Sequence, residues 1–141
     1  MNAKTSAVII LISFVYTFVA YGEDFEKFDK GSNLDILSPA VRCLFDAAAE
    51  NDSTAFSACF SSDVSVNIAG MRFDGREEVV AFAERDIWGG KYKVEKVFKQ
   101  GNKEIVHCLF WPEGWSSPEP PIEYQFDIKD GKLINWFGKY R

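Results

Sequence analysis

Residues 91–111 read KYKVEKVFKQGNKEIVHCLFW. Apolar and polar residues alternate on both sides of Gly101-Asn102, and a period of two is typical of a half-buried β-strand. A turn-forming pair between two such runs favours a hairpin. The stretch therefore predicts two antiparallel strands, from about Tyr92 to Phe98 and from Glu104 to Trp111.

Two more strands are expected towards the C-terminus. They run from about Ile122 to Ile128 and from Leu133 to Tyr140, and Asp130-Gly131 supplies the hairpin turn between them. The segment from Trp111 to Pro121 is rich in Pro and Ser and cannot form the interior of a strand. With Trp115 at its centre, this segment is a candidate lid over a binding site.

Before the first hairpin the hydrophobic period is mostly helical. Ser38 followed by Pro39 is typical of a helix start. Asn51-Asp52-Ser53 ends this helix and caps a second one; it also matches an N-glycosylation sequon, but capping is the simpler explanation. A strand at Val64 to Ile68 and a third helix after Gly75 follow. Helices first and strands afterwards predict an α+β fold, with the helices on one face of a curved antiparallel sheet.

The N-terminus has the features of an export signal. Lys4 gives a positive start, Ala7 to Ala20 is an almost unbroken apolar run, and Ala20-Tyr21-Gly22 is a suitable cleavage site. The apolar run is shorter than the roughly 20 residues that span a bilayer, so a permanent membrane anchor is the weaker alternative. We expect a signal peptide at 1–22, a flexible linker at 23–37 and one folded domain at 38–141, secreted or extracytoplasmic and not stably inserted in a membrane.

The composition excludes some classes of partner. The chain has 141 residues, a formal net charge of −5 and 16% aromatic residues. The length suits one domain with a sizeable core. No stripe of Lys and Arg is present, so nucleic acid is not an expected partner.

The sequence has three cysteines, Cys43, Cys59 and Cys108. Their spacing fits no zinc site, and we expect neither a metal nor another cofactor. A bridge between Cys43 and Cys59 is possible because they lie on consecutive helices, but we favour three small core residues.

Several motifs together resemble the nuclear transport factor 2-like superfamily, especially its SnoaL-like branch. They are Asn51-Asp52, AFSACFSSDV at 55–64, FDGREE at 73–78 and DIKDGKL at 127–133. The resemblance covers about Pro39 to Tyr140. It implies a cone, also called cystatin-like, in which a bent sheet wraps three helices around one deep cavity. The superfamily contains isomerases, cyclases, dehydratases and domains without catalysis, so this fold does not by itself define a function.

The resemblance also indicates where chemistry would lie. In its ketosteroid isomerases an Asp base and a Tyr plus a protonated acid flank the substrate oxygen. Here the base position falls at Asn67 and Ile68, the tyrosine position near Leu44 and the acid position near Tyr124. The usual acid/base set is therefore missing, although Tyr124 could donate a hydrogen bond to an oxyanion.

The expected site residues follow from these positions and from the inward face of the strands. As ligand-binding residues we predict Asn67, Trp88, Cys108, Phe110, Tyr124 and Trp136. Catalytic residues cannot be assigned, and Tyr124, Asn67 and His107 are weak candidates. His107 is the only histidine, and its ordinary pKa near neutrality suits acid/base catalysis.

Strand parity argues against a catalytic His107. The resemblance places Val106, Cys108 and Phe110 inside the cone, which leaves His107 outside, together with Ile105, Leu109 and Trp111. This outer face is too apolar for a sheet surface in water, so we expect it to form a homodimer. The alternative is a β-bulge or a one-residue slip, which would place His107 in the cavity.

Two functions remain open at this point. The first is a secreted SnoaL-like domain whose hydrophobic cavity binds a small apolar ligand, or which binds a protein partner, without the usual acid/base set. The alternative is an isomerase, cyclase or dehydratase that acts on a polyketide- or terpenoid-like small molecule.

Overall fold

The computed structural model describes residues 34–141, and the predicted signal peptide at 1–22 lies outside them. Their helices and strands follow the order helix, helix, two strands, helix, four strands after a short 3-10 turn. The elements are η1 (Leu34–Ile36), α2 (Pro39–Ala49), α3 (Ser53–Ala58), β1 (Phe60–Ile68), β2 (Met71–Asp74), α4 (Gly75–Asp86), β3 (Lys91–Gln100), β4 (Lys103–Trp111), β5 (Ile122–Lys129) and β6 (Lys132–Tyr140). The α+β class predicted from the sequence is confirmed.

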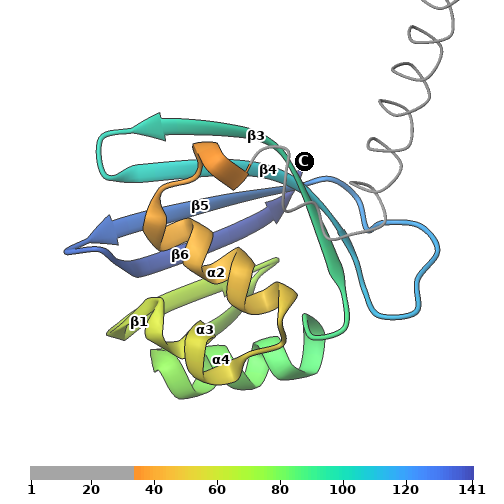
Figure 1. Ribbon diagram of the computed structural model, residues 1–141, viewed down its shortest axis with the longest axis horizontal. Helices are drawn as coiled ribbons and strands as arrows, with labels where there is room; N and C mark the ends of the chain where they lie inside the picture. Colours follow the sequence, from red (N-terminus) through yellow and green to blue (C-terminus); the bar gives the residue numbers. More distant parts are fainter. Residues whose placement is uncertain (1–33) are drawn as a thin grey trace, which may run out of the picture.

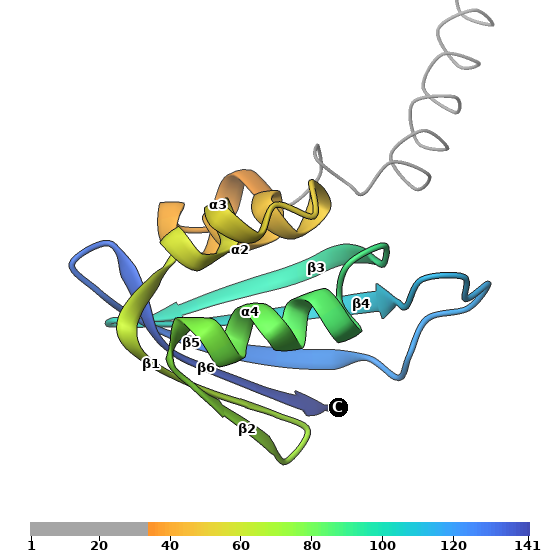
Figure 2. The ribbon, with the colours of Figure 1, turned by 90° about the horizontal axis from the view of Figure 1, so that it is seen from below.

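The six strands form one curved, open sheet in the order β2-β1-β6-β5-β4-β3. All neighbouring pairs are antiparallel except β1 and β6, which are parallel, so the sheet is mixed. A parallel pair is possible here because the chain between β1 and β6 is long enough for the crossover connection that parallel strands require. The helices gather on one side of the bent sheet, where α4 packs against β1 and β2 (Figures 1 and 2).

The folded domain begins earlier than Ser38. Leu34 in η1 and Leu37 after it are both buried against the core, so the last residues of the expected linker belong to the domain. Ser38 is the N-cap of α2 and Pro39 its first residue, as the sequence predicts. The Ser38 backbone N–H donates to the Glu104 carboxylate at 3.0 Å. This bond satisfies a backbone donor at the helix start and gives buried Glu104 a partner.

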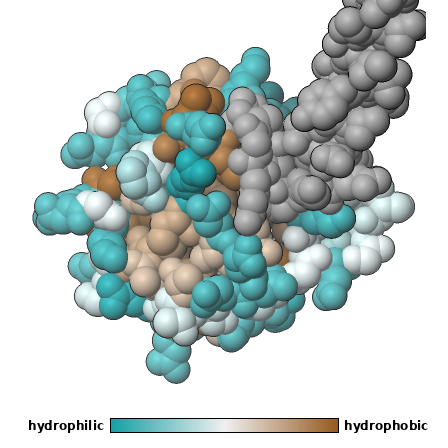
Figure 3. All heavy atoms as spheres, in the orientation of Figure 1, coloured by the Kyte–Doolittle hydropathy of each residue, from teal (hydrophilic) through white to brown (hydrophobic). Residues whose placement is uncertain are grey.

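The core is centred on Trp136 of β6, which is fully buried. Its ring stacks with Phe60 at a centroid distance of 6.1 Å and with Phe126 at 5.9 Å. Phe56 of α3 meets Trp136 edge-on and joins the helices to the sheet. Most apolar side chains of α2 face this core, while hydrophilic residues cover much of the helix side of the molecule around a moderately hydrophobic patch (Figure 3).

A disulfide joins Cys43 and Cys59, whose Cα atoms lie 5.7 Å apart. The preference for three unpaired core cysteines was therefore wrong for this pair. The α2–α3 hairpin folds the two helices back on each other, and this brings the two thiols together. Cys108 is a free, buried cysteine.

The predicted faces of β4 are confirmed. Val106, Cys108 and Phe110 are buried on the inner face, and His107 lies on the outer face, half-buried. The structure has a register shift in this region, but it lies in β3, between Val94 and Lys96. The side chains of β4 alternate without interruption. A slip that would turn His107 into the cavity is therefore excluded.

Candidate functional site

A cavity of about 830 Å³ opens at one end of the sheet. Figure 2 shows the C-terminal end of α4, the loop between β4 and β5 and the end of β6 at the same end of the molecule, and residues of all three line the cavity. Side chains from β3, β4 and β5 form its floor, and the loop supplies Pro112, Glu113, Trp115 and Glu119. The volume falls in the range of sites for small organic ligands, about 300–1,000 Å³.

Two tyrosine hydroxyls meet at the floor of this cavity. Tyr92 of β3 and Tyr124 of β5 are each 3% exposed, and their hydroxyl oxygens are 2.8 Å apart in a buried hydrogen bond. Burial raises the pKa of both phenols well above the ordinary value. Both groups therefore stay protonated at neutral pH, and Tyr124 can accept a hydrogen bond from Tyr92 while donating its own hydrogen to a ligand oxygen.

Aromatic rings surround the tyrosine pair. Phe110 packs on Tyr92 with a centroid distance of 4.6 Å, and Trp88 packs edge-on against Phe56 of the core at 5.1 Å. These contacts hold Phe110 and Trp88 in position as cavity walls. The result is an apolar interior with two hydroxyl groups that can orient a ligand.

Gly138 of β6 provides space for the Tyr124 ring. A Cβ at this position would lie 2.8 Å from Cε1 of Tyr124 and 2.9 Å from Cδ1 of Ile68. Both distances are shorter than a side-chain contact allows, so any larger residue would displace one of these two cavity-lining side chains.

The structure brings three of the six predicted ligand residues together. Trp88, Phe110 and Tyr124 line the cavity. Cys108 and Trp136 are buried in the core next to it and do not line it.

Asn67 and His107 do not line the cavity. Asn67 accepts a hydrogen bond from the Gly70 backbone N–H at 3.2 Å, within the β1–β2 turn. His107 Nε2 lies 2.9 Å from a Glu123 carboxylate oxygen on the outer face of the sheet. That carboxylate has a lowered pKa, first because Gln125 donates a hydrogen bond to it and also because His107 does.

Sequence reasoning missed Tyr92, Glu119 and Tyr140. Tyr92 has the same parity as buried Val94, so its inward position was readable from the alternation. Its pairing with Phe110 depends on the register shift between Val94 and Lys96, which the turn alone does not predict. Glu119 and Tyr140 carried no such signal, because a loop residue and the end of the last strand meet only in the folded chain. The Tyr140 hydroxyl donates to the Glu119 carboxylate at 2.6 Å, and this bond raises the pKa of Tyr140 to about 12.

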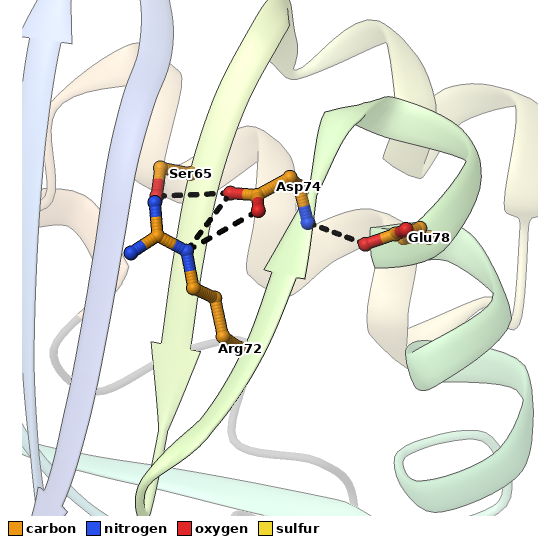
Figure 4. Close-up of polar contacts among 4 residues, drawn as sticks. All are labelled: Ser65, Arg72, Asp74 and Glu78. Atoms are coloured by element: carbon orange, nitrogen blue, oxygen red, sulfur yellow. Dashed lines mark hydrogen bonds and ion pairs between the residues drawn. The ribbon is translucent and has the colours of Figure 1, made fainter.

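Asp74 belongs to a polar cluster whose residues do not line the cavity. Its carboxylate accepts hydrogen bonds from Arg72 and Ser65, and its backbone N–H donates to Glu78 at 2.6 Å (Figure 4). These groups are exposed and join β1, β2 and the start of α4. The cluster fixes the entry into α4, which is a structural role.

Between residues 34 and 141 no helix is long and apolar enough to cross a membrane. Over the same residues, no three His, Cys, Asp or Glu side chains are grouped to hold a metal ion.

Comparison with solved structures identifies the fold. A Sinorhizobium meliloti protein described as a polyketide cyclase is 24% identical; the match covers 75% of this chain and 98% of that one, with a TM-score of 0.67. An NTF2-like protein of unknown function from Cytophaga hutchinsonii is 15% identical over 79% and 94% of the two chains, with a TM-score of 0.65. This chain has a nuclear transport factor 2-like fold. The fold predicted from the sequence motifs is thereby confirmed.

Another structure with the nuclear transport factor 2-like fold contains a ligand. It is a Mycobacterium tuberculosis protein in complex with estradiol-17beta-hemisuccinate, 17% identical over 74% of this chain and 95% of that one, with a TM-score of 0.63. No protein-family model and no curated protein matches the sequence. At these identities the comparison establishes the fold, and the site must be interpreted from its own residues.

Proposed function

We propose that this protein binds a small apolar molecule in its cavity and holds an acceptor oxygen of that molecule on the Tyr92–Tyr124 pair. The buried hydroxyl pair carries the proposal, because it places a hydrogen-bond donor among the aromatic and aliphatic residues that line the cavity away from its exposed charged side chains. Two structures of the same fold support it: one contains a steroid ester, and another is a computationally designed 17-OHP binder, 21% identical to this chain.

The proposal is tested with 2-acetylnaphthalene, a flat apolar ketone, titrated into the protein by calorimetry. We expect binding to the unaltered protein and about two- to tenfold weaker binding to Tyr124→Phe, the loss caused by one hydrogen bond. Tyr140→Phe removes a hydroxyl at the exposed rim and serves as the matched control. Binding that is unchanged in Tyr124→Phe would show that the tyrosine pair does not hold the ligand oxygen.

A second candidate function is catalysis by an isomerase, cyclase or dehydratase on a polyketide- or terpenoid-like substrate. The observation that favours it is the Glu119 carboxylate, which lines the same cavity as the two phenol donors. A carboxylate can remove a proton next to a carbonyl while hydrogen-bond donors stabilise the resulting enolate oxygen. The test is deuterium uptake from heavy water at the methyl group of bound 2-acetylnaphthalene. Protein-dependent exchange that is lost in Glu119→Gln supports catalysis, and exchange no faster than in buffer opposes it.

We also propose that the protein is secreted with its signal peptide removed. The apolar N-terminus supports this, and so does the Cys43–Cys59 disulfide, because such bonds persist mainly in oxidising compartments. N-terminal sequencing of the protein from its own host should give Glu23 as the first residue. A chain that retains the apolar run would support an anchor instead.

The outer face of the sheet is the proposed homodimer interface. Phe98 and Phe137 are 44% and 37% exposed there, and Phe98 packs edge-on against His107. Phe98→Lys should convert a dimer to a monomer in sedimentation experiments, because it places a charge in an apolar interface. Ile36→Lys changes an exposed hydrophobic residue of η1 and should leave the dimer intact. A monomeric unaltered protein at micromolar concentration would refute the dimer.

A further inference from the structure

The rim of the cavity carries more negative than positive groups. Its lining contains the carboxylates of Asp86, Glu113 and Glu119 and the cations of Arg85 and Lys139. Arg85 forms an ion pair with Asp86 at 2.6 Å. Lys139 lies 3.6 Å from Glu123, a carboxylate of the outer sheet face. Glu113 and Glu119 are therefore the charges that a ligand at the rim would meet.

Both residues are held at the rim by their neighbours. The Glu119 backbone N–H donates to the Phe110 carbonyl at 2.8 Å, and its side chain accepts from the Tyr140 hydroxyl. This neutral donor leaves the negative charge of Glu119 in place. Glu113 packs on Gly89, where a Cβ would lie 2.6 Å from its carboxyl carbon. The two charges thus stand on the loop side of the opening, one of them against the turn that follows α4.

Two further features of the rim favour a cation. The last residues of α4 line the cavity, and the C-terminal end of a helix carries partial negative charge. Two exposed aromatic side chains line the same cavity: Trp115 is 58% exposed, and Tyr140, which bonds Glu119, is 50% exposed. Aromatic faces attract alkylammonium groups, and quaternary ammonium ligands are commonly bound this way.

We infer that the ligand is a cationic amphiphile, with an acceptor oxygen on the Tyr92–Tyr124 pair, an apolar body between the aromatic walls and an alkylammonium group at Glu113, Glu119 and Trp115. This inference rests on the proposed function, because it assigns the two ends of a ligand bound in the same cavity. Its positive charge, bound at the rim, distinguishes this ligand from a neutral steroid or an anionic ester.

The test uses three ketones that share the 2-acetylnaphthalene body and differ at the end of one 6-propyl chain. The chain ends in a trimethylammonium group, in a tert-butyl group of the same shape without charge, or in a carboxylate. Titration by calorimetry should give about three- to tenfold tighter binding for trimethylammonium than for tert-butyl, chiefly because two partly exposed carboxylates attract the charge, with a smaller share from the face of Trp115. The carboxylate should bind more weakly than both.

A charge-removal variant locates the effect. In Glu113→Gln/Glu119→Gln the preference for trimethylammonium over tert-butyl should fall to about one- to twofold. The matched control is Asp63→Asn/Glu77→Gln, which changes the net charge equally at exposed positions outside the cavity and should keep the preference.

The outcomes separate the inference from the proposed function. Equal binding of the three ketones to the unaltered protein, or tightest binding of the carboxylate, overturns the cationic ligand and leaves the apolar binding site standing. If none of the ketones and not even 2-acetylnaphthalene binds, the proposed function fails and the inference fails with it. The comparison of the three ketones uses the unaltered protein, so the test remains decisive even if a variant does not fold.

Discussion

Breaking the Cys43–Cys59 disulfide should destabilise the domain by an amount that depends on the length of the loop that the bond closes. The two cysteines are 16 residues apart. Closing a loop of that length removes chain entropy from the unfolded state equivalent to about 3 kcal/mol at 25 °C. The Cys43→Ala/Cys59→Ala variant should therefore lose about 3 kcal/mol of unfolding free energy, with a further loss if the two methyl groups pack poorly.

The loss should also reach the cavity. The bridge ties α2 to the start of β1, directly after α3, and Phe56 of α3 supports Trp88 in the cavity wall. We expect the variant to bind 2-acetylnaphthalene more weakly at temperatures where the unaltered protein is fully folded. Tryptophan fluorescence, to which Trp88 contributes together with the other tryptophans, follows both the loss of stability and the change in the cavity wall during urea unfolding of one sample.

The assay is urea unfolding with and without reductant, followed by circular dichroism. The unaltered protein should shift to lower urea on reduction, and the double variant should not, because it has no bridge to break. Cys108→Ala is the control, since it removes the free thiol and keeps the bridge. A midpoint that stays the same on reduction, with the bond shown broken by mass spectrometry, would refute the loop-entropy argument.

Two other predictions concern the cavity. Gly138→Ala should cost about 1–3 kcal/mol of stability, because its Cβ would displace the Tyr124 ring; thermal unfolding measures the cost, and an unchanged midpoint contradicts it. The pKa of Tyr140, about 12 because Glu119 accepts its hydrogen bond, should fall towards 10 in Glu119→Gln, as followed by tyrosinate absorbance. Since folding raises this pKa, its contribution to stability is complete below pH 10 and lost as the pH rises to about 12. Glu113→Gln should leave the titration unchanged.

The strands and their faces were predictable because alternation is local. In β4 each side chain points to the face opposite its neighbour, so the position of His107 followed once Val106 and Cys108 were assigned to the core. Turn residues between the runs then placed the hairpins. The same reasoning extends to Tyr92, whose parity already turned it inward.

The candidate site was predictable only in part. Trp88, Phe110 and Tyr124 lie near the open end of the sheet, whereas Trp136 lies deeper in the same layer and packs in the core. Parity fixes which face a residue belongs to, but depth along the cone depends on the register between strands. Asn67 shows another limit, since its side chain bonds to the local turn.

The sequence by itself determined the class of fold, the helix starts and the inward or outward direction of most strand residues, because each depends on residues a few positions apart. Only the tertiary structure decided the disulfide, the hydroxyl pair of Tyr92 and Tyr124, and the charged rim around Glu119 and Tyr140. These contacts join residues 16, 32 and 21 positions apart. Their geometry comes from sheet curvature and the packing of α4 and the loop, which local patterns do not encode.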